Sequence, residues 1–257
     1  MTDSRLLTPA RKPRMRLFPA IIAMLVSTPF AGNAGSFTPP KGCTAFLTVQ
    51  MKSCSVEHHW TCEGDPAGVQ WVLSIDGDGP SYLQQIDEEF RWLQSFPQRS
   101  DVSRVLIQPE PDANSMTELL EQRRDDFDFK QSVMRGGKPY AVEHVTGYDR
   151  LNGTRVMIDG EKLLVTEFMI EVSSSVDGSV VRTTGNQFVS ARFRLFFQGR
   201  ETEISGGETY NYDDTPVLFI EPGEAGFMAD KPEFGCDEMM SRLEMPMAIE
   251  KEIQDEL

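Results

Sequence analysis

Two adjacent histidines, His58 and His59, lie between Cys54 and Cys62. Imidazole and thiolate groups are the usual ligands of zinc, so this segment is the first candidate for a metal site. However, the sequence lacks a C-x-x-C pair, and the spacings from Cys43 to Cys54 and from Cys54 to Cys62 are eleven and eight residues. Neighbouring residues of a strand also point to opposite faces, which prevents the two imidazoles from sharing one site easily. We therefore expect no metal here.

A second candidate metal site is a methionine group near the C-terminus, formed by Met239, Met240, Met245 and Met247. Thioethers are soft ligands for Cu(I). The same residues would also serve as adaptable packing groups of an amphipathic helix over residues 237–257. Pro246 interrupts the helical spacing, and packing is the interpretation that we prefer.

Acid–base chemistry would require carboxyl groups with separated pKa values. Acidic residues cluster at 87–89, 125–128 and 213–214, although in an acidic chain such clusters are usually solvated. His144 shares a strand face with Tyr140 and Val142, which favours a core or edge histidine over a catalytic base. The sequence has no G-x-S-x-G, H-E-x-x-H, P-loop or G-x-G-x-x-G motif. We predict no catalytic residue, no cofactor and no metal.

Four cysteines, Cys43, Cys54, Cys62 and Cys236, form an even set. In an exported chain such a set indicates two disulfides. Three pairings are possible, and we favour Cys54 with Cys62 and Cys43 with Cys236, because nearby strand positions suit a short loop.

Residues 1–34 have the layout of a secretory signal peptide, with basic residues before an apolar stretch and small residues Gly32 and Ala34 at a cleavage site. The apolar stretch is shorter than the ~20 residues that span a bilayer. We therefore expect Gly35 to be the first residue of the mature protein. N-terminal sequencing of the exported protein tests this, and recovery of residues 1–14 on the folded protein would contradict it.

Charge limits the partners of the mature chain. The whole chain has a formal net charge of −15, and residues 35–257 retain 20 basic and 39 acidic residues, or −19. Such a chain repels nucleic acid and anionic lipid headgroups. We expect no nucleic-acid partner and no transmembrane segment after residue 34.

Alternation of apolar and polar residues dominates the rest of the sequence. Three examples are residues 47–52, 69–75 and 189–198, and each pattern predicts a strand with one buried face. The turn dipeptides Asn152-Gly153, Asp159-Gly160 and Asp177-Gly178 predict hairpins between runs 140–150, 154–158, 162–173 and 180–184. A further run, 187–198, is expected to end at Gly199. Links this short predict an antiparallel meander.

One long helix is expected over residues 115–134, beginning at a capping box of Ser115 and Glu118 and ending at Gly136-Gly137. Residues 81–96 fit either a helix or a strand, and the Asp76–Gly79 turn before them favours a strand. Residues 206–236 are predicted to wrap irregularly over the sheet, with a short buried strand at 217–220.

These elements predict a mainly β fold in three parts: signal peptide 1–34, one β-rich domain 35–236 and the tail helix 237–257. A long curved antiparallel sheet would carry the helix across its concave face. The residues that would then face an apolar ligand are Leu120, Phe127, Phe193 and Leu195.

The hairpin segments Gly147–Gly153, Ile158–Glu161, Thr166–Phe168 and Arg194–Gly199 resemble those of uncharacterised exported proteins of Gram-negative bacteria. The resemblance covers about 50 residues and implies an envelope location but no activity. Periplasm or secretion is therefore expected. A sequon at Asn152-Gly-Thr154 and the final Gln-Asp-Glu-Leu leave the endoplasmic reticulum lumen as a less favoured alternative.

Three functional hypotheses follow. The first is a non-catalytic periplasmic binding or envelope-maintenance protein, with a small apolar ligand such as a lipid, or an envelope protein, as partner. The second is an interaction module that recruits a basic protein through its acidic surface. The third is a hydrolase that uses carboxyl groups.

Overall fold

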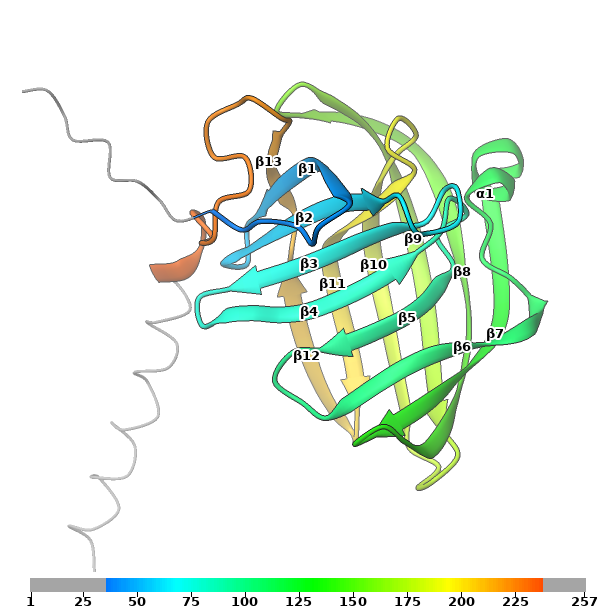
Figure 1. Cartoon of the computed structure of the whole chain (residues 1–257). Helices are drawn as coiled ribbons and strands as arrows, with labels where there is room; N and C mark the ends of the chain where they lie inside the picture. Colours follow the sequence, from blue (N-terminus) through cyan, green and yellow to red (C-terminus); the bar gives the residue numbers. More distant parts are fainter. Residues whose placement is uncertain (1–35, 238–257) are drawn as a thin grey trace, which may run out of the picture. The chain divides into compact units, whose positions relative to one another are not determined.

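The protein, seen here as a computed structural model, is described over residues 36–237 (Figure 1). The strands are β1 (Cys43–Met51), β2 (Ser55–Cys62), β3 (Gln70–Asp76), β4 (Gly79–Ile86), β5 (Trp92–Pro97), β6 (Val102–Asp112), β7 (Arg124–Arg135), β8 (Lys138–Ile158), β9 (Glu161–Ser174), β10 (Val180–Ser190), β11 (Leu195–Ser205), β12 (Glu208–Asp213) and β13 (Pro216–Ile220). Helix α1 (Met116–Gln122) is the one helix that lies wholly within residues 36–237. The predicted mainly β fold with an antiparallel sheet and one helix is confirmed. The expected tail helix and its methionines lie outside the described residues, apart from Asp237.

All thirteen strands belong to one sheet, in the order β12-β11-β10-β9-β8-β7-β6-β5-β4-β3-β2-β1-β13. Twelve strands follow chain order, and only β13 returns to pair with β1. Because Asp214 and Thr215 alone separate β12 from β13, the two edges of the sheet must lie close together. The sheet therefore curls back on itself, and in Figure 1 the nearer strands β3–β6 cross in front of β8–β11.

The two edges are joined by specific contacts. Lys52, after β1, donates its backbone N–H to the carbonyl of Thr215, and its ammonium lies 2.7 Å from Asp213 at the end of β12. The backbone N–H of Asp214 reaches the carbonyl of Gly199 on β11. These bonds hold the sheet in its curled form.

The predicted long helix over residues 115–134 is wrong in its second half. Ser115 is the N-cap as expected, with its hydroxyl accepting from the N–H of Glu118 at 3.1 Å. The helix ends after two turns at Arg123, whose φ of 69° is left-handed. From Arg124 the chain is strand β7, in which alternate residues from Asp125 to Val133 are buried. Pairing with both β6 and β8 favours the strand over the helical alternative.

Residues 81–86 and 92–96 are strand, as favoured, in β4 and β5, but residues 87–91 form a loop between them. Asp76–Gly79 forms the turn before β4. Other boundaries also differ from the prediction. Asn152-Gly153 is no hairpin turn but an irregularity inside the single long strand β8, where residues 152–154 fall between the pairs Leu151–Thr166 and Arg155–Leu164. Run 187–198, predicted as one strand, is a hairpin: β10 ends at Ser190, residues 191–194 form a turn and β11 begins at Leu195. Strand β11 then continues past Gly199 to Ser205, because β12 pairs with this extension.

The disulfides are Cys43–Cys62 and Cys54–Cys236, so the expectation of two bridges is confirmed but the favoured pairing is wrong. Cys54 lies in the turn before β2 and Cys62 at the far end of that strand. At ~3.3 Å per residue the two lie roughly 25 Å apart, far beyond the reach of a disulfide. Cys43 is instead the cross-strand partner of Cys62. The bridges indicate an oxidising, non-cytoplasmic location.

The apolar core occupies part of the curl of the sheet. One cluster contains Val165, Phe188 and Phe197 of β9–β11, packed against Leu47 of β1 and Phe219 of β13. The alternate residues of the same strand ends pack in a second cluster beneath α1, together with Met116 and Leu119. The turn ends of β9–β11 are thus buried on both faces. Helix α1 covers that end of the curl rather than crossing the whole concave face, as had been expected.

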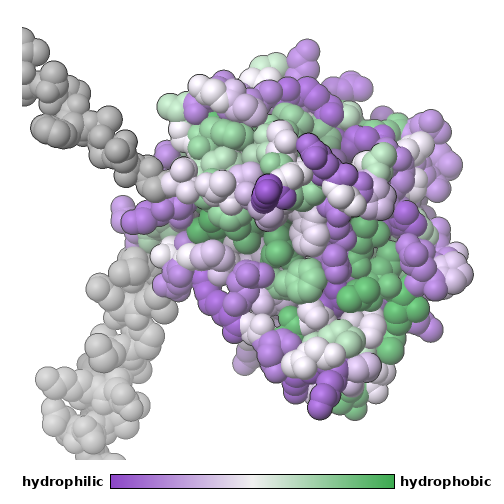
Figure 2. All heavy atoms as spheres, viewed as in Figure 1, coloured by the Kyte–Doolittle hydropathy of each residue, from purple (hydrophilic) through white to green (hydrophobic). Residues whose placement is uncertain are grey.

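The outer face of β1–β4 is covered by the segments before β1 and after β13. Phe37 stacks on His58 at 5.5 Å, and His58 bonds to the hydroxyl of Thr48 and the carbonyl of Ala229. Burial lowers the pKa of His58 to about 4. Figure 2 shows apolar side chains among polar ones on the face toward the viewer. The predicted wrap is thus present from residue 221, whereas residues 208–213 form β12.

None of the described helices has the length and apolar character needed to cross a membrane.

Candidate functional site

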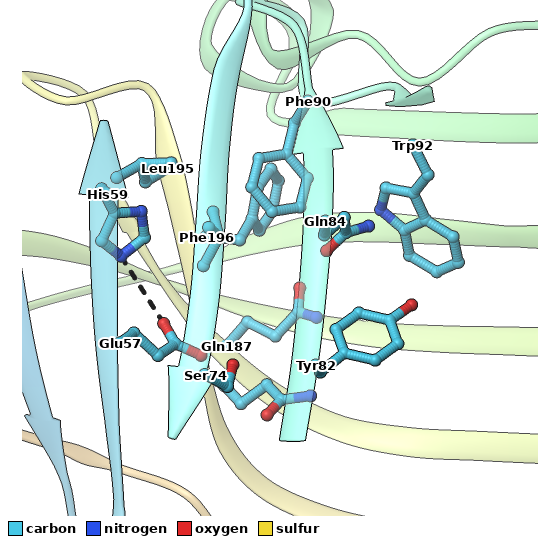
Figure 3. A pocket seen from close by; sticks show the side chains of 12 residues that line it. Glu57, His59, Ser74, Tyr82, Gln84, Phe90, Trp92, Gln187, Leu195 and Phe196 are labelled. Atoms are coloured by element: carbon cyan, nitrogen blue, oxygen red, sulfur yellow. Dashed lines mark ion pairs between the residues drawn. The ribbon is translucent and has the colours of Figure 1, made fainter. Parts of the chain in front are cut away.

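A cavity of about 440 Å³ lies inside the curl of the sheet (Figure 3). One wall comes from β2–β4 and the other from the start of β11 and the end of β10; the loop after β4 and the start of β5 complete it. The lining residues are Glu57, His59, Val72, Ser74, Tyr82, Gln84, Phe90, Trp92, Gln187, Leu195, Phe196 and Gln198. Gln198 is exposed, which places it where the cavity meets solvent. A cavity of this size suits a small-molecule ligand.

Strand register explains why these residues converge. His59 is the cross-strand partner of Val72, and Val72 is the partner of Gln84. Directly opposite residues of paired strands point to the same face. Glu57, Ser74 and Tyr82 form the next row in the same way. The concave face of β2–β4 is therefore more polar than the rest of the interior.

His59 and Glu57 are the ionisable pair of the cavity. The Nε2 atom of His59 lies 3.6 Å from the carboxylate of Glu57, too far for a hydrogen bond but close enough for an ion pair when the ring is protonated. His59 is only 1% exposed, and neither ring nitrogen has a hydrogen-bond partner in the protein. Burial of an unpartnered polar group is unfavourable. The ring is thus available to a ligand.

Aromatic rings form the opposite side of the cavity. The rings of Phe90 and Phe196 lie 4.7 Å apart, and Trp92 meets Phe129 edge to face at 5.6 Å. Figure 3 shows Tyr82 and Trp92 beside each other, with Gln84 between them and Phe196. Burial raises the pKa of the Tyr82 hydroxyl, which therefore stays neutral. The site combines flat apolar surfaces with amide and hydroxyl groups.

The Phe90 loop is held in place by two of the carboxyl groups noted in the sequence. Glu89 accepts hydrogen bonds from the hydroxyl of Ser115 and the N–H of Thr117 at the start of α1, and from Arg194 before β11. Asp87 accepts from Arg91 at 2.6 Å and from two backbone N–H groups of the loop. These residues support the cavity wall and do not line it.

Asp125 and Asp149 are directly opposite on β7 and β8, and are only 3% and 7% exposed. One oxygen of each has no hydrogen-bond partner, while the other oxygen of Asp125 accepts from the N–H of Ser115. Burial raises the pKa of both carboxyls to about 7, and the charge of Asp125 contributes further to the rise at Asp149. The pair lies under the start of α1, away from the cavity lining.

Only one of the four residues expected to face a ligand lies in the cavity lining, namely Leu195. Leu120 packs in the cluster under α1, and Phe127 is a core residue of β7 beside Phe129. Phe193 belongs to the turn before β11 and contacts Phe46 of β1. The expected helical arrangement of Leu120 and Phe127 fails because the two residues belong to different elements.

The two adjacent histidines do point to opposite faces, as predicted: His58 outward and His59 into the cavity. His144 is half-buried and hydrogen-bonds Asp128 on the neighbouring strand at 2.7 Å. Over residues 36–237, no cluster of three or more histidine, cysteine, aspartate or glutamate side chains is suited to hold a metal ion.

The glutamines of the cavity were not singled out in the sequence. The alternation over residues 69–75 predicted that Val69, Trp71, Leu73 and Ile75 lie on the buried face. The residues of β3 that line the cavity are instead the alternate ones, Val72 and Ser74.

Comparisons of the chain with protein-family models, with curated proteins and with solved structures gave no match.

Proposed function

We propose that this protein is a non-catalytic periplasmic binding protein that holds a small ligand with an apolar body inside its curled sheet. The observation that carries this proposal is the cavity, in which Phe90, Trp92 and Phe196 provide apolar surface and three glutamine side chains provide hydrogen bonds. Ligand sites generally combine such apolar walls with a few polar groups. The disulfides and the sequence of residues 1–34 support export.

The hydrolase alternative has less support. The best acid–base pair by environment, Asp125 and Asp149, is covered by α1 and is not part of the cavity lining. A substrate in the cavity would not contact it. The interaction-module alternative rests on net charge, which by itself usually serves solubility.

Cavity filling is the direct test of the proposed function. Ser74 lies on the cavity wall and is half-buried, so Ser74→Trp would occupy the space without forcing a large group into the packed core. We expect wild-type protein to enhance the fluorescence of the neutral probe N-phenyl-1-naphthylamine, and Ser74→Trp to weaken its binding at least tenfold. Gln187→Trp fills the cavity from the opposite wall and should have the same effect.

The matched control is Thr184→Trp, since Thr184 is exposed on β10 and does not line the cavity. It should bind the probe like wild type. Equal binding by all four proteins would place the probe elsewhere and contradict the proposal. If the cavity variants do weaken binding, native mass spectrometry of protein extracted from its own host would identify any ligand that co-purifies.

A further inference from the structure

The charges that line the cavity indicate which chemical class of ligand it binds. This inference rests on the proposed binding function. Neither lysine nor arginine is present among the lining residues. Glu57 is the one carboxylate of the lining, and its side chain is 18% exposed. A carboxylate or phosphate headgroup placed here would therefore meet a negative charge and no lysine or arginine. This argues against fatty acids and anionic lipids as ligands.

Two further carboxyl groups, Asp214 and Glu201, interact electrostatically with Glu57 directly or through each other. Glu201 follows Gln198 along β11, and one of its buried oxygens has no hydrogen-bond partner. Burial and the charge of Asp214 raise the pKa of Glu201 to about 7. Burial also raises the pKa of Asp214, with a further contribution from the charge of Glu57. The pKa values of carboxyl groups rise in this way on burial and beside other negative charges.

Cations close to the site are already paired. Arg104, near Tyr82, makes two hydrogen bonds to Glu143, at 2.7 and 3.0 Å. Lys52 is bound to Asp213. Neither is free to neutralise Glu57 or an anionic ligand.

His59 provides an independent sign of a missing partner. It is 1% exposed, lines the cavity and lacks a hydrogen bond at both ring nitrogens. Next to it, aromatic rings form the apolar side of the same cavity. Such rings attract cations through their negative faces, most strongly in the case of tryptophan.

We propose that the cavity binds an organic cation, with an amine or quaternary ammonium group beside Glu57 and an apolar body against Phe90, Trp92 and Phe196. A positive headgroup would balance the carboxylate of Glu57, which no lysine or arginine of the lining pairs with. The aromatic rings would contact the apolar body and the methyl groups of a quaternary headgroup. The amides of Gln187 and Gln198 would orient any hydroxyl or carbonyl group that the ligand carries.

Three probes of equal chain length separate charge from apolar contact: octyltrimethylammonium, octanol and octanoate, each measured by displacement of N-phenyl-1-naphthylamine at neutral pH. We expect octyltrimethylammonium to bind at least tenfold more tightly than octanol, and octanoate to bind more weakly than octanol. Glu57→Gln should remove the preference for the cation, so that octyltrimethylammonium no longer binds more tightly than octanol.

The control for overall charge is Glu63→Gln, because Glu63 is exposed after β2 and does not line the cavity. It changes the net charge of this acidic protein equally and should leave the preference intact. Gln198→Lys adds a cation at an exposed lining position and is expected to shift the preference toward octanoate, which tests the inference even if Glu57→Gln does not fold.

The failures of the two proposals are distinguishable. Binding of the neutral probe without any preference for octyltrimethylammonium, or a preference that survives Glu57→Gln, overturns the cation inference and leaves the binding function in place. Absence of binding for all four compounds overturns both.

Discussion

Replacing Cys54 and Cys236 together by serine is expected to lower the free energy of unfolding by about 5 kcal/mol. The bridge joins residues 182 positions apart, and closing a loop of that length removes a large entropy from the unfolded chain. It also fastens the segment after β13, whose Ala229 carbonyl bonds to His58, over the outer face of β1 and β2. Guanidinium unfolding followed by circular dichroism measures the loss.

The second bridge provides the matched comparison. Cys43 and Cys62 are 19 positions apart, so replacing that pair should cost less, about 3 kcal/mol. The position before Cys236 adds a further test. A Cβ atom on Gly235 would clash with the carbonyl oxygen of Lys52, and the φ of Gly235, +73°, is in the left-handed region. Gly235→Ala should therefore also destabilise the wrap. A larger loss from the short loop than from the long one would contradict the loop-closure explanation.

Asp149→Asn is expected to stabilise the protein at neutral pH by about 2–4 kcal/mol and to have little effect at pH 4. The buried carboxyl of Asp149 has a pKa of about 7 in the folded protein, against the ordinary 3.8. The folded state therefore binds the proton more tightly than the unfolded state does. This contribution to stability is fully present below pH 4 and is lost as the pH rises through about 7.

Asp125→Asn should act in the same direction but less strongly, because the second oxygen of Asp125 also accepts the N–H of Ser115. The effects of the two substitutions should not add, since relief of one charge also relieves its cross-strand neighbour. Asp101→Asn, at an exposed position, is the control and should leave the pH profile unchanged. A free energy of unfolding that rises from pH 4 to pH 8 in wild type and is unaffected by Asp149→Asn would refute the account.

The pH dependence is best measured between pH 4 and pH 8. Below this range other carboxyls act with the opposite sign. Hydrogen bonds from Lys52, Thr215 and Arg200 hold the pKa of Asp213 well below its usual value despite burial, so its contribution is lost only in strong acid. Hydrogen bonds from Arg99 likewise lower the pKa of Asp76.

Several features were readable from local sequence. Alternation of apolar and polar residues identified most strands, since a strand repeats every two residues whatever it packs against. The turn at Asp76–Gly79 and the N-cap at Ser115 were also identified, because each depends on neighbours within four residues. The even set of cysteines indicated disulfides, and the strands alone predicted that His58 and His59 would face opposite ways.

Local signals failed where two local patterns competed or where distant strands decided the outcome. Leu119, Leu120 and Phe127 fit a helical face, yet Phe127 also fits the alternation of β7, and pairing with β6 and β8 selects the strand. Asn152-Gly153 would suit a hairpin, but β9 pairs on both sides of it and turns it into an irregularity.

By itself, then, the sequence determined most of the strands, their antiparallel order and the presence of two disulfides, because these follow from periods, turns and counts along the chain. Tertiary structure decided the cysteine partners and the cavity. Cys236 meets Cys54, and Gln187 and Phe196 meet His59 and Tyr82, only after the sheet curls until β12 and β13 come together. That curl depends on contacts between residues more than 100 positions apart, which no local pattern encodes.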